Sequence, residues 1–329
     1  MPSLQGATVL VTGGSGFVGG HLLERLRRVA DVQCHATTLA PLQLQGSQAF
    51  CRWHQLDTTD SEATNDLVAS IKPDVLFHLA AQSHVPTSFD QPQLTWEVNL
   101  QGTLNLLDAA VCAVPRAVFV NVASSDIYGR SFQGGAPINE SSPLLPLNPY
   151  AASKAAADLA AFQYSATTPL KIIRARPFNH SGTGQGEGFV LPAFAAQIAR
   201  IEAGLQEPMM AVGDLSAERD FLHIDDVVSA YMAIACQAAD IESGAAFNIA
   251  SGRTFTIADM LGLLLAASTS TIEVRQDPAR LRPVDIPRVC GDSGALRQAV
   301  GWQPQKTSAD LVADLLTDWR ARVRTEVRG

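Results

Sequence analysis

Short apolar runs alternate with helical patterns along the first half of the chain. The runs are continuous rather than interrupted by polar residues, which indicates strands buried on both faces of a sheet. Strand–helix–strand repetition of this kind predicts an α/β fold with a right-handed, doubly wound parallel sheet. The predicted strands are Thr8–Thr12, Val32–Thr37, Asp74–Ala80, Ala117–Ala123 and Leu170–Arg174. The predicted helices are Gly16–Arg28, Ser61–Ser70, Pro92–Cys112 and Pro149–Gln163.

The regular alternation of strands and helices ends after Phe178. A glycine-rich loop and a helix at Leu191–Gly204 follow, and then the helix Asp225–Gln237 and the strand Ala246–Ala250 indicate a return to the sheet. The remaining residues add helices and the short strand Thr271–Arg275. We therefore expect two interleaved parts. The larger domain would hold residues 1–178 with about 225–250, and a smaller, discontinuous α/β lobe would hold 179–224 and 251–329.

Composition narrows the classes of partner. The net charge of -8 and pI of about 5.3 disfavour nucleic acid, because an acidic surface repels a polyphosphate backbone. The five cysteines are odd in number and never in C-x-x-C spacing, so we expect neither a disulfide framework nor a zinc site, and a cytoplasmic protein. The chain has no run of ~20 apolar residues, so we expect no membrane span and no signal peptide. The cysteines are Cys34, Cys51, Cys112, Cys236 and Cys290.

A glycine turn follows the first predicted strand. Residues 9–19 read V-L-V-T-G-G-S-G-F-V-G, with Gly13, Gly16 and Gly19 three apart where the next helix begins. Such glycines let the backbone turn tightly and approach a pyrophosphate, which meets free N–H groups and the positive end of the helix dipole. We predict a dinucleotide site here that includes Phe17 and Val18, in the larger domain. The alternative is a turn with a structural role only.

A tyrosine and a lysine lie four residues apart at the start of a later helix. In Y-x-x-x-K, Tyr150 and Lys154 share one helix face, and the ammonium is expected to lower the pKa of the phenol. Ser124 ends the preceding strand, where its hydroxyl can hold a carbonyl oxygen while Tyr150 protonates it. These residues predict carbonyl chemistry; the alternative is an inactive scaffold that kept them for packing.

The glycine turn, S-S-D-I-Y-G (124–129) and N-P-Y-A-A-S-K (148–154) together resemble the extended short-chain dehydrogenases/reductases. The resemblance implies a Rossmann fold, an NAD(P) cofactor and a Ser124–Tyr150–Lys154 triad. It also implies that Asn99 bonds backbone and supports Lys154 through water, the alternative being a plain polar helix residue, whereas Tyr128 is expected to be structural. For Asp57, the alternative to adenine contact is a helix cap. The remaining cofactor contacts that it implies are Thr37, Leu56, Asp57, Leu79, Ala80, Ala81 and Pro177.

Cofactor preference is weakly marked. An acidic residue at the end of the second strand would bind the ribose hydroxyl of NAD, and an arginine would accept the 2′-phosphate of NADP. The stretch His35–Thr38 has neither. The missing carboxylate removes a repulsion against phosphate, so NADPH is slightly favoured and dual use stays open.

The second part of the chain resembles enzymes of nucleotide sugars. R-P-F-N (176–179) and R-D-F (219–221) match their signatures, and residues 176–226 are most similar to the GDP-mannose-processing branch, in particular GDP-6-deoxy-4-keto-mannose reductases. The resemblance implies a GDP-linked sugar bound partly through Asn179 and Arg219, while Asp226 is expected to cap a helix. The full set of expected substrate contacts is Ser83, Ser125, Asp126, Asn179, Val190, Arg219 and Arg280.

One position separates the members of this branch. The dehydratases carry a glutamate where this chain has Asp126, one methylene shorter, and Ser125 stands where the dTDP-glucose dehydratases have aspartate. The resemblance therefore favours reduction of GDP-4-keto-6-deoxy-D-mannose to GDP-D-rhamnose, or to its C4 epimer GDP-6-deoxy-D-talose, in deoxysugar biosynthesis. A 4,6-dehydratase or 4-epimerase and a non-catalytic dinucleotide-binding protein are the alternatives. The resemblance also implies a homodimer joined through helices 92–112 and 149–163.

Overall fold

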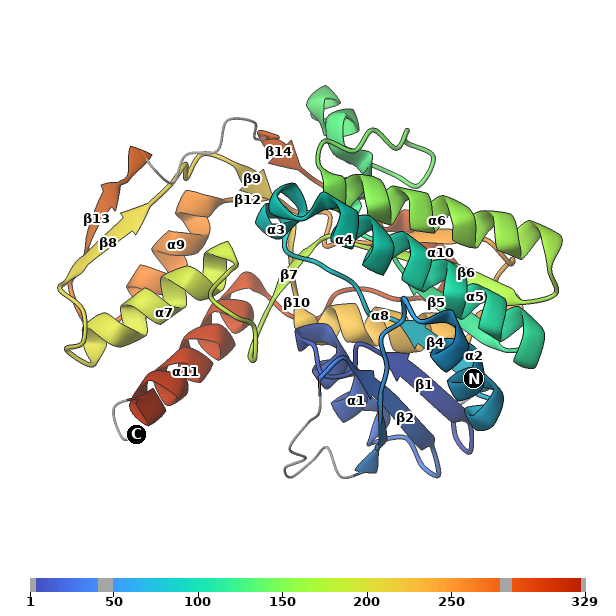
Figure 1. Ribbon diagram of the computed structural model, residues 1–329. Coiled ribbons are helices and arrows are strands. Elements are labelled where there is room, and N and C mark those ends of the chain that lie inside the picture. The colour runs from blue at the N-terminus through green and yellow to red at the C-terminus, as the bar shows by residue number, and fades with distance from the viewer. Residues whose placement is uncertain (1–3, 41–49, 279–285, 327–329) are drawn as a thin grey trace.

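The computed structural model describes residues 4–40, 50–278 and 286–326. Two lobes are visible in Figure 1: a large one built on a sheet, and a smaller one in which helices pack beside short strands. Chain segments pass between the lobes more than once.

The large lobe is organised around a seven-stranded sheet, in the order β11-β6-β5-β4-β1-β2-β3. Every pairing in it is parallel, which confirms the doubly wound, Rossmann-type α/β prediction. The strands lie within a few residues of their predicted positions, β6 runs on to Pro177, and β3 is an additional strand. Their bounds are β1 Thr8–Thr12, β2 Gln33–Thr38, β3 Arg52–Gln55, β4 Val75–His78, β5 Val118–Val122, β6 Lys171–Pro177 and β11 Ala246–Ile249.

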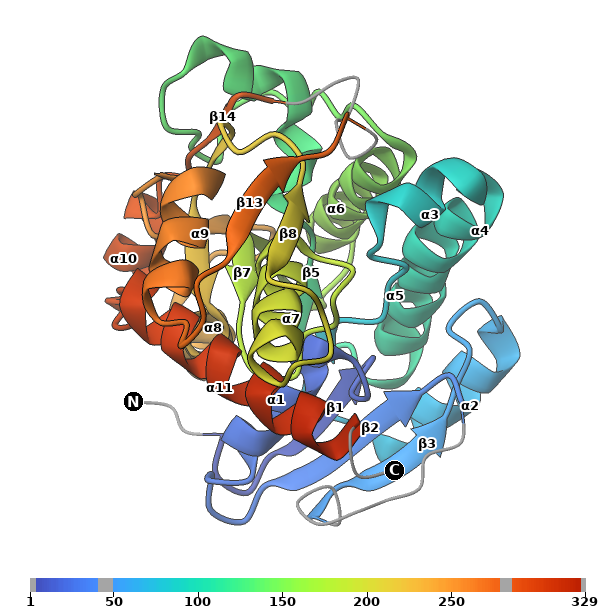
Figure 2. The same ribbon diagram turned by 90° about the vertical axis from the view of Figure 1, so that its left-hand side faces the viewer.

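Helices cover both faces of the sheet (Figures 1 and 2). Helices α1 and α8 pack on one face around Val11, Leu22 and Tyr231, and α2, α5 and α6 pack on the other around Leu10 and Leu106. Two buried faces explain why the strands read as continuous apolar runs. The helix bounds are α1 Phe17–Leu26, α2 Ser61–Ile71, α5 Gly102–Ala113, α6 Pro149–Thr167 and α8 Ile224–Cys236.

The helix predicted at Pro92–Cys112 is present, with a π-helical turn inside it. It comprises α4 (Pro92–Trp96), a π-helical turn (Glu97–Gln101) and α5, and a short helix α3 (Val85–Asp90) precedes it. A Cβ on Gly102 would lie 2.5 Å from Oγ1 of Thr58, so only glycine allows this approach. The Thr103 hydroxyl donates to the carbonyl of Asn99, a bond that bends helices. The predicted helix is confirmed, and the widened turn at its centre was not predicted.

Two short parallel strands join the lobes: β7 (Asn179–Ser181) follows β6, and β10 (Phe221–His223) precedes α8. The small lobe has its own apolar core between α7, α9 and α11. The predicted division of the chain stays a proposal, although Leu296 of α10 and Trp302 pack with the core of the large lobe. The remaining elements are α7 Val190–Glu202, β8 Met209–Val212, β9 Glu218–Arg219, β12 Phe255–Thr256, α9 Ile257–Ala266, β13 Glu273–Gln276, β14 Arg288–Val289, α10 Gly294–Val300 and α11 Ser308–Glu326.

A buried carboxylate ties α6 to β6. Asp158 has no exposed side-chain surface and receives Arg174 at 2.7 Å and Arg176 at 2.6 Å. Arg176 also donates to the hydroxyl of Tyr128 at 2.9 Å, and that hydroxyl donates to Asn248. Because buried charges are tolerated only when they are paired and hydrogen-bonded, this cluster fixes α6 against the sheet.

Replacing Asp158 by asparagine should be strongly destabilising. The amide cannot balance two guanidinium groups held away from water, so we expect the free energy of unfolding to fall by about 3–5 kcal/mol. Glu187→Gln, which breaks a partly exposed pair with Arg200, is the matched control and should cost no more than about 1 kcal/mol. Urea unfolding followed by circular dichroism measures both. Equal losses in the two variants would contradict the assignment.

Candidate active site

The glycine turn has the shape that a dinucleotide needs. Gly13 has φ +69°, and a Cβ there would lie 2.8 Å from the backbone nitrogen of Ala80; a Cβ on Gly19 would lie 2.3 Å from the carbonyl oxygen of Gly13. Helix α1 then begins after Gly16 with no side-chain cap and no acidic residue in its first turn. Its first N–H groups and the positive end of its dipole therefore suit an anion, so the residues present fit a pyrophosphate.

The carboxyl ends of the neighbouring strands lie beside this turn and form one wall of the candidate cofactor site. The Gly13 N–H donates to Oγ1 of Thr37, and the Ala80 N–H donates to Oγ1 of Thr12. These contacts bring together the carboxyl ends of β1, β2 and β4, the edge at which open α/β sheets bind ligands. Leu79 and Ala81 flank Ala80 after β4, and Pro177 ends β6.

Asp57 does not cap the helix that follows it. The carboxylate of Asp60 caps α2 by accepting the N–H of Ala63, whereas exposed Asp57 accepts from Thr59. Leu56, just before it, donates its N–H to the carbonyl of Thr38 and so continues the wall from β3. The alternative interpretation of Asp57 as a cap was wrong.

Tyr150 lies in the first turn of α6, next to Ser124. Asn148 caps this helix by accepting the N–H of Ala151 at 2.8 Å, and Pro149 occupies its first turn. Burial and the negative charge of Asp126 raise the pKa of Tyr150, while the hydrogen bond with Ser124 opposes the rise. The phenol is thus held protonated beside a second hydroxyl, an arrangement that can donate a proton to a bound oxygen.

Lys154 lies one turn further along α6. Its ammonium donates to the carbonyl of Val122 at 2.5 Å, and burial lowers its pKa to about 8 against the opposing charge of Asp158. The expected direction of the tyrosine pKa was wrong, because burial and the charge of Asp126 raise it.

The predicted substrate residues that the structure describes are spread over both lobes and the segments between them. Ser125 is buried, and Asp126 is near enough to Tyr150 to affect its pKa. Asn179 is half-buried at the start of β7, and Arg219 on β9 donates from Nη1 to the carbonyl of Ile286 at 2.8 Å. Ser83 and Val190 are exposed on opposite lobes, and Arg280 lies outside the described residues.

Two motif residues have structural contacts. His223, not Asp226, caps α8, and the Asp226 carboxylate accepts the N–H groups of Gln305 and Lys306. The predicted cap was therefore wrong by three residues. Tyr128 is fully buried and bonded to Asn248, as expected of a structural residue.

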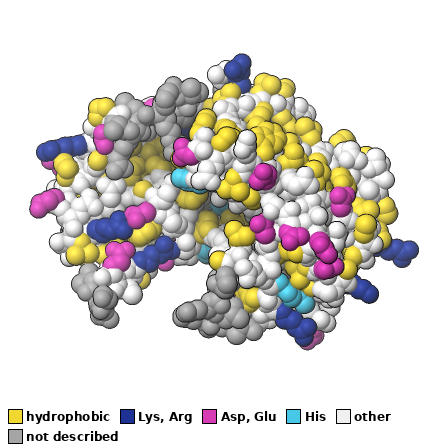
Figure 3. Space-filling model, in the orientation of Figure 1, with side chains coloured by type: hydrophobic (Ala, Val, Ile, Leu, Met, Phe, Trp, Pro, Cys, Tyr) yellow, Lys and Arg dark blue, Asp and Glu magenta, His cyan; other side chains and the backbone are white. Residues whose placement is uncertain are grey.

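Sequence reasoning missed a contact across the opening between the lobes. The rings of His84, at the start of α3, and Phe189, just before α7, meet edge to face at 6.5 Å. Figure 3 shows this face of the molecule hollowed between the two lobes. No spacing rule connects residues so far apart in sequence. Asp158, also missed, had a signal: it lies four residues after Lys154, and two arginines alternate on the buried strand β6.

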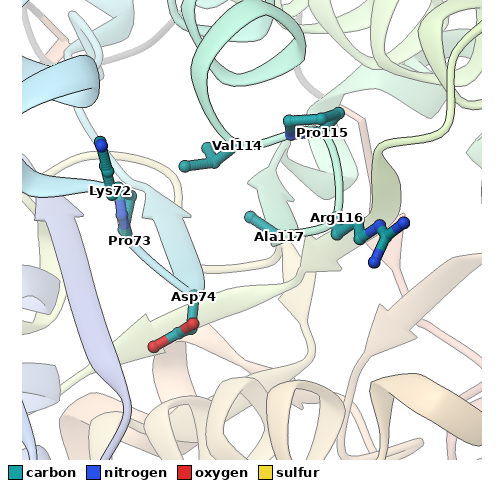
Figure 4. Close-up of a pocket in the computed structure, with 7 residues that line it drawn as sticks. All are labelled: Lys72, Pro73, Asp74, Val114, Pro115, Arg116 and Ala117. Carbon is teal, nitrogen blue, oxygen red and sulfur yellow. The ribbon is translucent and has the colours of Figure 1, made fainter.

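A separate hollow of about 340 Å³ lies at the opposite edge of the sheet. Figure 4 shows its lining at the amino ends of β4 and β5, from Lys72–Asp74 and Val114–Ala117. Ligands of such sheets bind at the carboxyl edge, so we do not assign the active site here. Within the described ranges, no group of three or more His, Cys, Asp or Glu side chains is placed to hold a metal ion. None of the described helices is long and apolar enough to cross a membrane.

Comparison with known proteins agrees with these features. The family model of GDP-mannose 4,6 dehydratase matches residues 10–315. The GDP-6-deoxy-D-mannose reductase of Pseudomonas aeruginosa is 37% identical over 97% of this chain and 99% of its own. The solved structure of RMD from Pseudomonas aeruginosa, complexed with NADPH, has a TM-score of 0.83 at 35% identity, and covers 96% of this chain and 99% of that one.

A second solved structure extends the likeness. The Thermus thermophilus UDP-glucose 4-epimerase, in complex with NAD, has a TM-score of 0.81 at 28% identity and covers 95% of this chain and 99% of that one. The resemblance inferred from the glycine turn and the Y-x-x-x-K helix is therefore confirmed. The chain belongs to the GDP-mannose 4,6 dehydratase family of NAD(P)-dependent, extended short-chain dehydrogenases/reductases.

Proposed function

We propose that this protein reduces the C4 ketone of GDP-4-keto-6-deoxy-D-mannose with NADPH or NADH. The product would be GDP-D-rhamnose or its C4 epimer GDP-6-deoxy-D-talose, for deoxysugar biosynthesis in the cytoplasm. The observation that carries the proposal is the phenol of Tyr150, kept protonated by burial and close enough to the Ser124 hydroxyl for it to affect the tyrosine pKa, at the edge of the sheet where the glycine turn lies. The likeness to the reductase from Pseudomonas aeruginosa supports the choice of substrate.

The side chains divide the work at the ketone. A reduced nicotinamide, when bound, supplies the hydride. Tyr150 would give its proton to the C4 oxygen, and Ser124 would donate a hydrogen bond to the same oxygen as negative charge develops on it. Lys154 would hold the ribose of the cofactor and, as a cation, stabilise the phenolate left on Tyr150.

The cofactor would lie along the carboxyl edge of the sheet. The N–H groups of Phe17 and Val18 would donate hydrogen bonds to the pyrophosphate. The residues that follow β3 and β4 would contact the adenosine and nicotinamide ends. Thr37 and Thr38 end β2 without a charge, which leaves NADPH slightly favoured. Solved relatives carry NADPH in one case and NAD in another, in line with dual use.

The nucleotide sugar would bridge the lobes. Arg219 can offer a guanidinium to the diphosphate, and Asn179 an amide, from the two segments that cross between the lobes. Ser83 and Val190 would contact it from opposite sides. Arg280 lies outside the described residues, and its proposed contact with the substrate rests only on the sequence resemblance.

A 4,6-dehydratase is the second candidate. Asp126 places a carboxylate close enough to Tyr150 to raise its pKa, so an acidic group stands at the position of the elimination base. The aspartate is one methylene short of the glutamate used for that step, and catalysis is sensitive to displacements of about 1 Å. We therefore favour the reductase.

A homodimer would bury the apolar face of α4 and α6. Leu94 and Trp96 on α4, and Leu159 and Phe162 on α6, are large apolar side chains that are 38–55% exposed. Apolar surface gathers over these helices in Figure 3. Soluble monomers seldom leave large contiguous apolar patches in water, so a second copy of the chain is the proposed cover.

Tyr150→Phe should lower kcat by ~100- to 10,000-fold, because it removes the proton donor. NADPH binding, followed by fluorescence, should persist. Tyr164→Phe makes the same chemical change further along α6, where the hydroxyl contacts Asp108 at the surface, and should leave turnover near normal. Near-normal turnover of a folded Tyr150→Phe protein would overturn the role of Tyr150.

Cofactor stoichiometry separates the reductase from the dehydratase. With GDP-mannose alone we expect little reaction; when a separate 4,6-dehydratase is added, we expect loss of one NADPH per product. Deuterium from labelled NADPH should appear at C4 of the sugar by NMR. Efficient formation of the 4-keto sugar by this chain alone, without net loss of NADPH, would establish the dehydratase instead.

Light scattering at micromolar concentration should give twice the chain mass of 35.0 kDa. Leu159→Glu with Phe162→Glu should give monomers, since charge on the apolar face cannot be buried in the contact. Leu205→Glu changes a residue of similar exposure on the small lobe and should leave the dimer intact. A monomeric wild-type protein would refute the dimer.

A further inference from the structure

His78 ends strand β4 beneath the glycine turn and is 1% exposed. One ring nitrogen, Nδ1, lies 2.8 Å from Oγ1 of Thr12, and the other, Nε2, lies 2.9 Å from Oγ1 of Thr103. The ring therefore joins the strand that leads into Gly13 to the helix that carries the π-helical turn. Neither the substrate proposal nor the cofactor contacts account for it.

The protons in this chain of bonds have one consistent arrangement. The Thr103 hydroxyl donates its only proton to the carbonyl of Asn99, at 2.7 Å. Its oxygen must therefore accept the hydrogen bond from Nε2–H of His78. Nδ1 then carries no proton and accepts from the Thr12 hydroxyl, whose oxygen in turn accepts the N–H of Ala80. Every proton on these side chains has an acceptor.

The ring stays neutral throughout the working range of pH. Burial, with a smaller contribution from the positive charge of Lys154, lowers the pKa of His78 to about 3. A second proton on the ring would displace the bond from Thr12. His78 is thus held in one tautomer, and each nitrogen has a different task.

The chain of bonds continues from the π-helical turn to α6. The Asn99 amide nitrogen donates to Oγ of Ser153 at 2.9 Å and to the carbonyl of Gln82, and its oxygen accepts the Gln82 N–H. The Ser153 hydroxyl donates to the carbonyl of Tyr150 at 2.8 Å. A widened helical turn of this kind frequently accompanies a functional site, and here it presents Asn99 to the first turn of α6.

We propose that His78 is a positioning residue for the Tyr150–Lys154 pair. Its Nε2–H holds Thr103 in the orientation that bonds the Asn99 carbonyl, and the π-helical turn so fixed sets Asn99 against Ser153 and the first turn of α6. The Nδ1 half of the ring serves only the strand end near Gly13. The kinetic part of this inference rests on the proposed reduction.

Two substitutions of His78 distinguish the roles of its two ring nitrogens. The side-chain amide of glutamine can place a nitrogen donor near the position of Nε2, whereas asparagine reaches only the position of Nδ1. We therefore expect His78→Gln to preserve most of the kcat of the wild type. His78→Asn should lower kcat roughly 10- to 100-fold, the effect of a displacement near 1 Å, with the KM for cofactor little changed.

Thr103 supplies the matched pair further along the chain of bonds. Thr103→Val removes the hydroxyl at nearly constant shape and should reproduce the loss in kcat, while Thr103→Ser keeps the hydroxyl and should restore it. Combining His78→Asn with Thr103→Val should cost no more than either change alone, because both break one connection.

Amide hydrogen exchange by mass spectrometry tests the same inference without substrate. Peptides that cover residues 97–104 and 150–155 should exchange faster in His78→Asn than in His78→Gln, whereas β1, whose Thr12 contact asparagine can keep, should not. Kinetics use whichever nucleotide sugar the wild type reduces. If none is reduced, the proposed function fails, and exchange still decides the role of His78.

Equal effects of asparagine and glutamine on kcat and on exchange would show that the ring only fills space, and would overturn the proposal. A loss confined to the KM for cofactor, rescued by asparagine, would place the function in the Thr12 half and overturn it equally. A variant that fails to fold is recognised by its circular dichroism, and the Thr103 pair then decides the outcome.

Discussion

The place of the reactive helix depends on one buried carboxylate shared by two arginines. Asp158 lies one turn beyond Lys154 on the same face of α6, so its pairing with β6 sets the depth at which the lysine enters the sheet. Arg176 also donates a hydrogen bond to Tyr128, so the same cluster restrains the segment that begins at Ser124. That segment bends at Gly129, where φ is +46° and a Cβ would strike the carbonyl of Leu145. Ser124 and Tyr150 consequently meet because a charge cluster beneath them leaves little freedom.

Much of the sheet could be predicted because the same local requirements apply to each of its strands. Strands covered on both faces must be apolar throughout, and the glycines must stand where backbone meets backbone, as at Gly13 and Gly19. The π-helical turn inside the helix could not be predicted in this way. One extra residue shifts the later side chains by about 100° around the axis, but α5 is buried on several sides, so its apolar positions do not reveal the shift. Gly102 also meets Thr58, which lies in a distant loop. The cap at His223 was missed for a similar reason, since Asp226 has its own partners far along the chain.

The site was predictable as a set of residue types, but its electrostatics were not. Y-x-x-x-K guarantees that Tyr150 and Lys154 share a face, yet the direction of the tyrosine pKa follows from burial and from Asp126, which only the fold brings near. The lysine faces the carbonyl of Val122. The opening between the lobes is built from segments separated by more than a hundred residues, as His84 and Phe189 illustrate, and no motif spans such a distance. Roles of individual substrate residues accordingly stay proposals.

The order of strands in the sheet has a consequence for biosynthesis. Edge strand β11 and the covering helix α8 are both made only after the chain has left the large lobe and returned. A nascent chain that has reached Phe178 therefore exposes the hydrogen-bonding edge of β6 and the apolar face later covered by α8. The core shared by Leu22, Tyr231 and Trp302 is completed only when nearly the whole chain has left the ribosome. The two lobes are thus unsuited to separate expression, and a chaperone that shields strand edges would act during that interval.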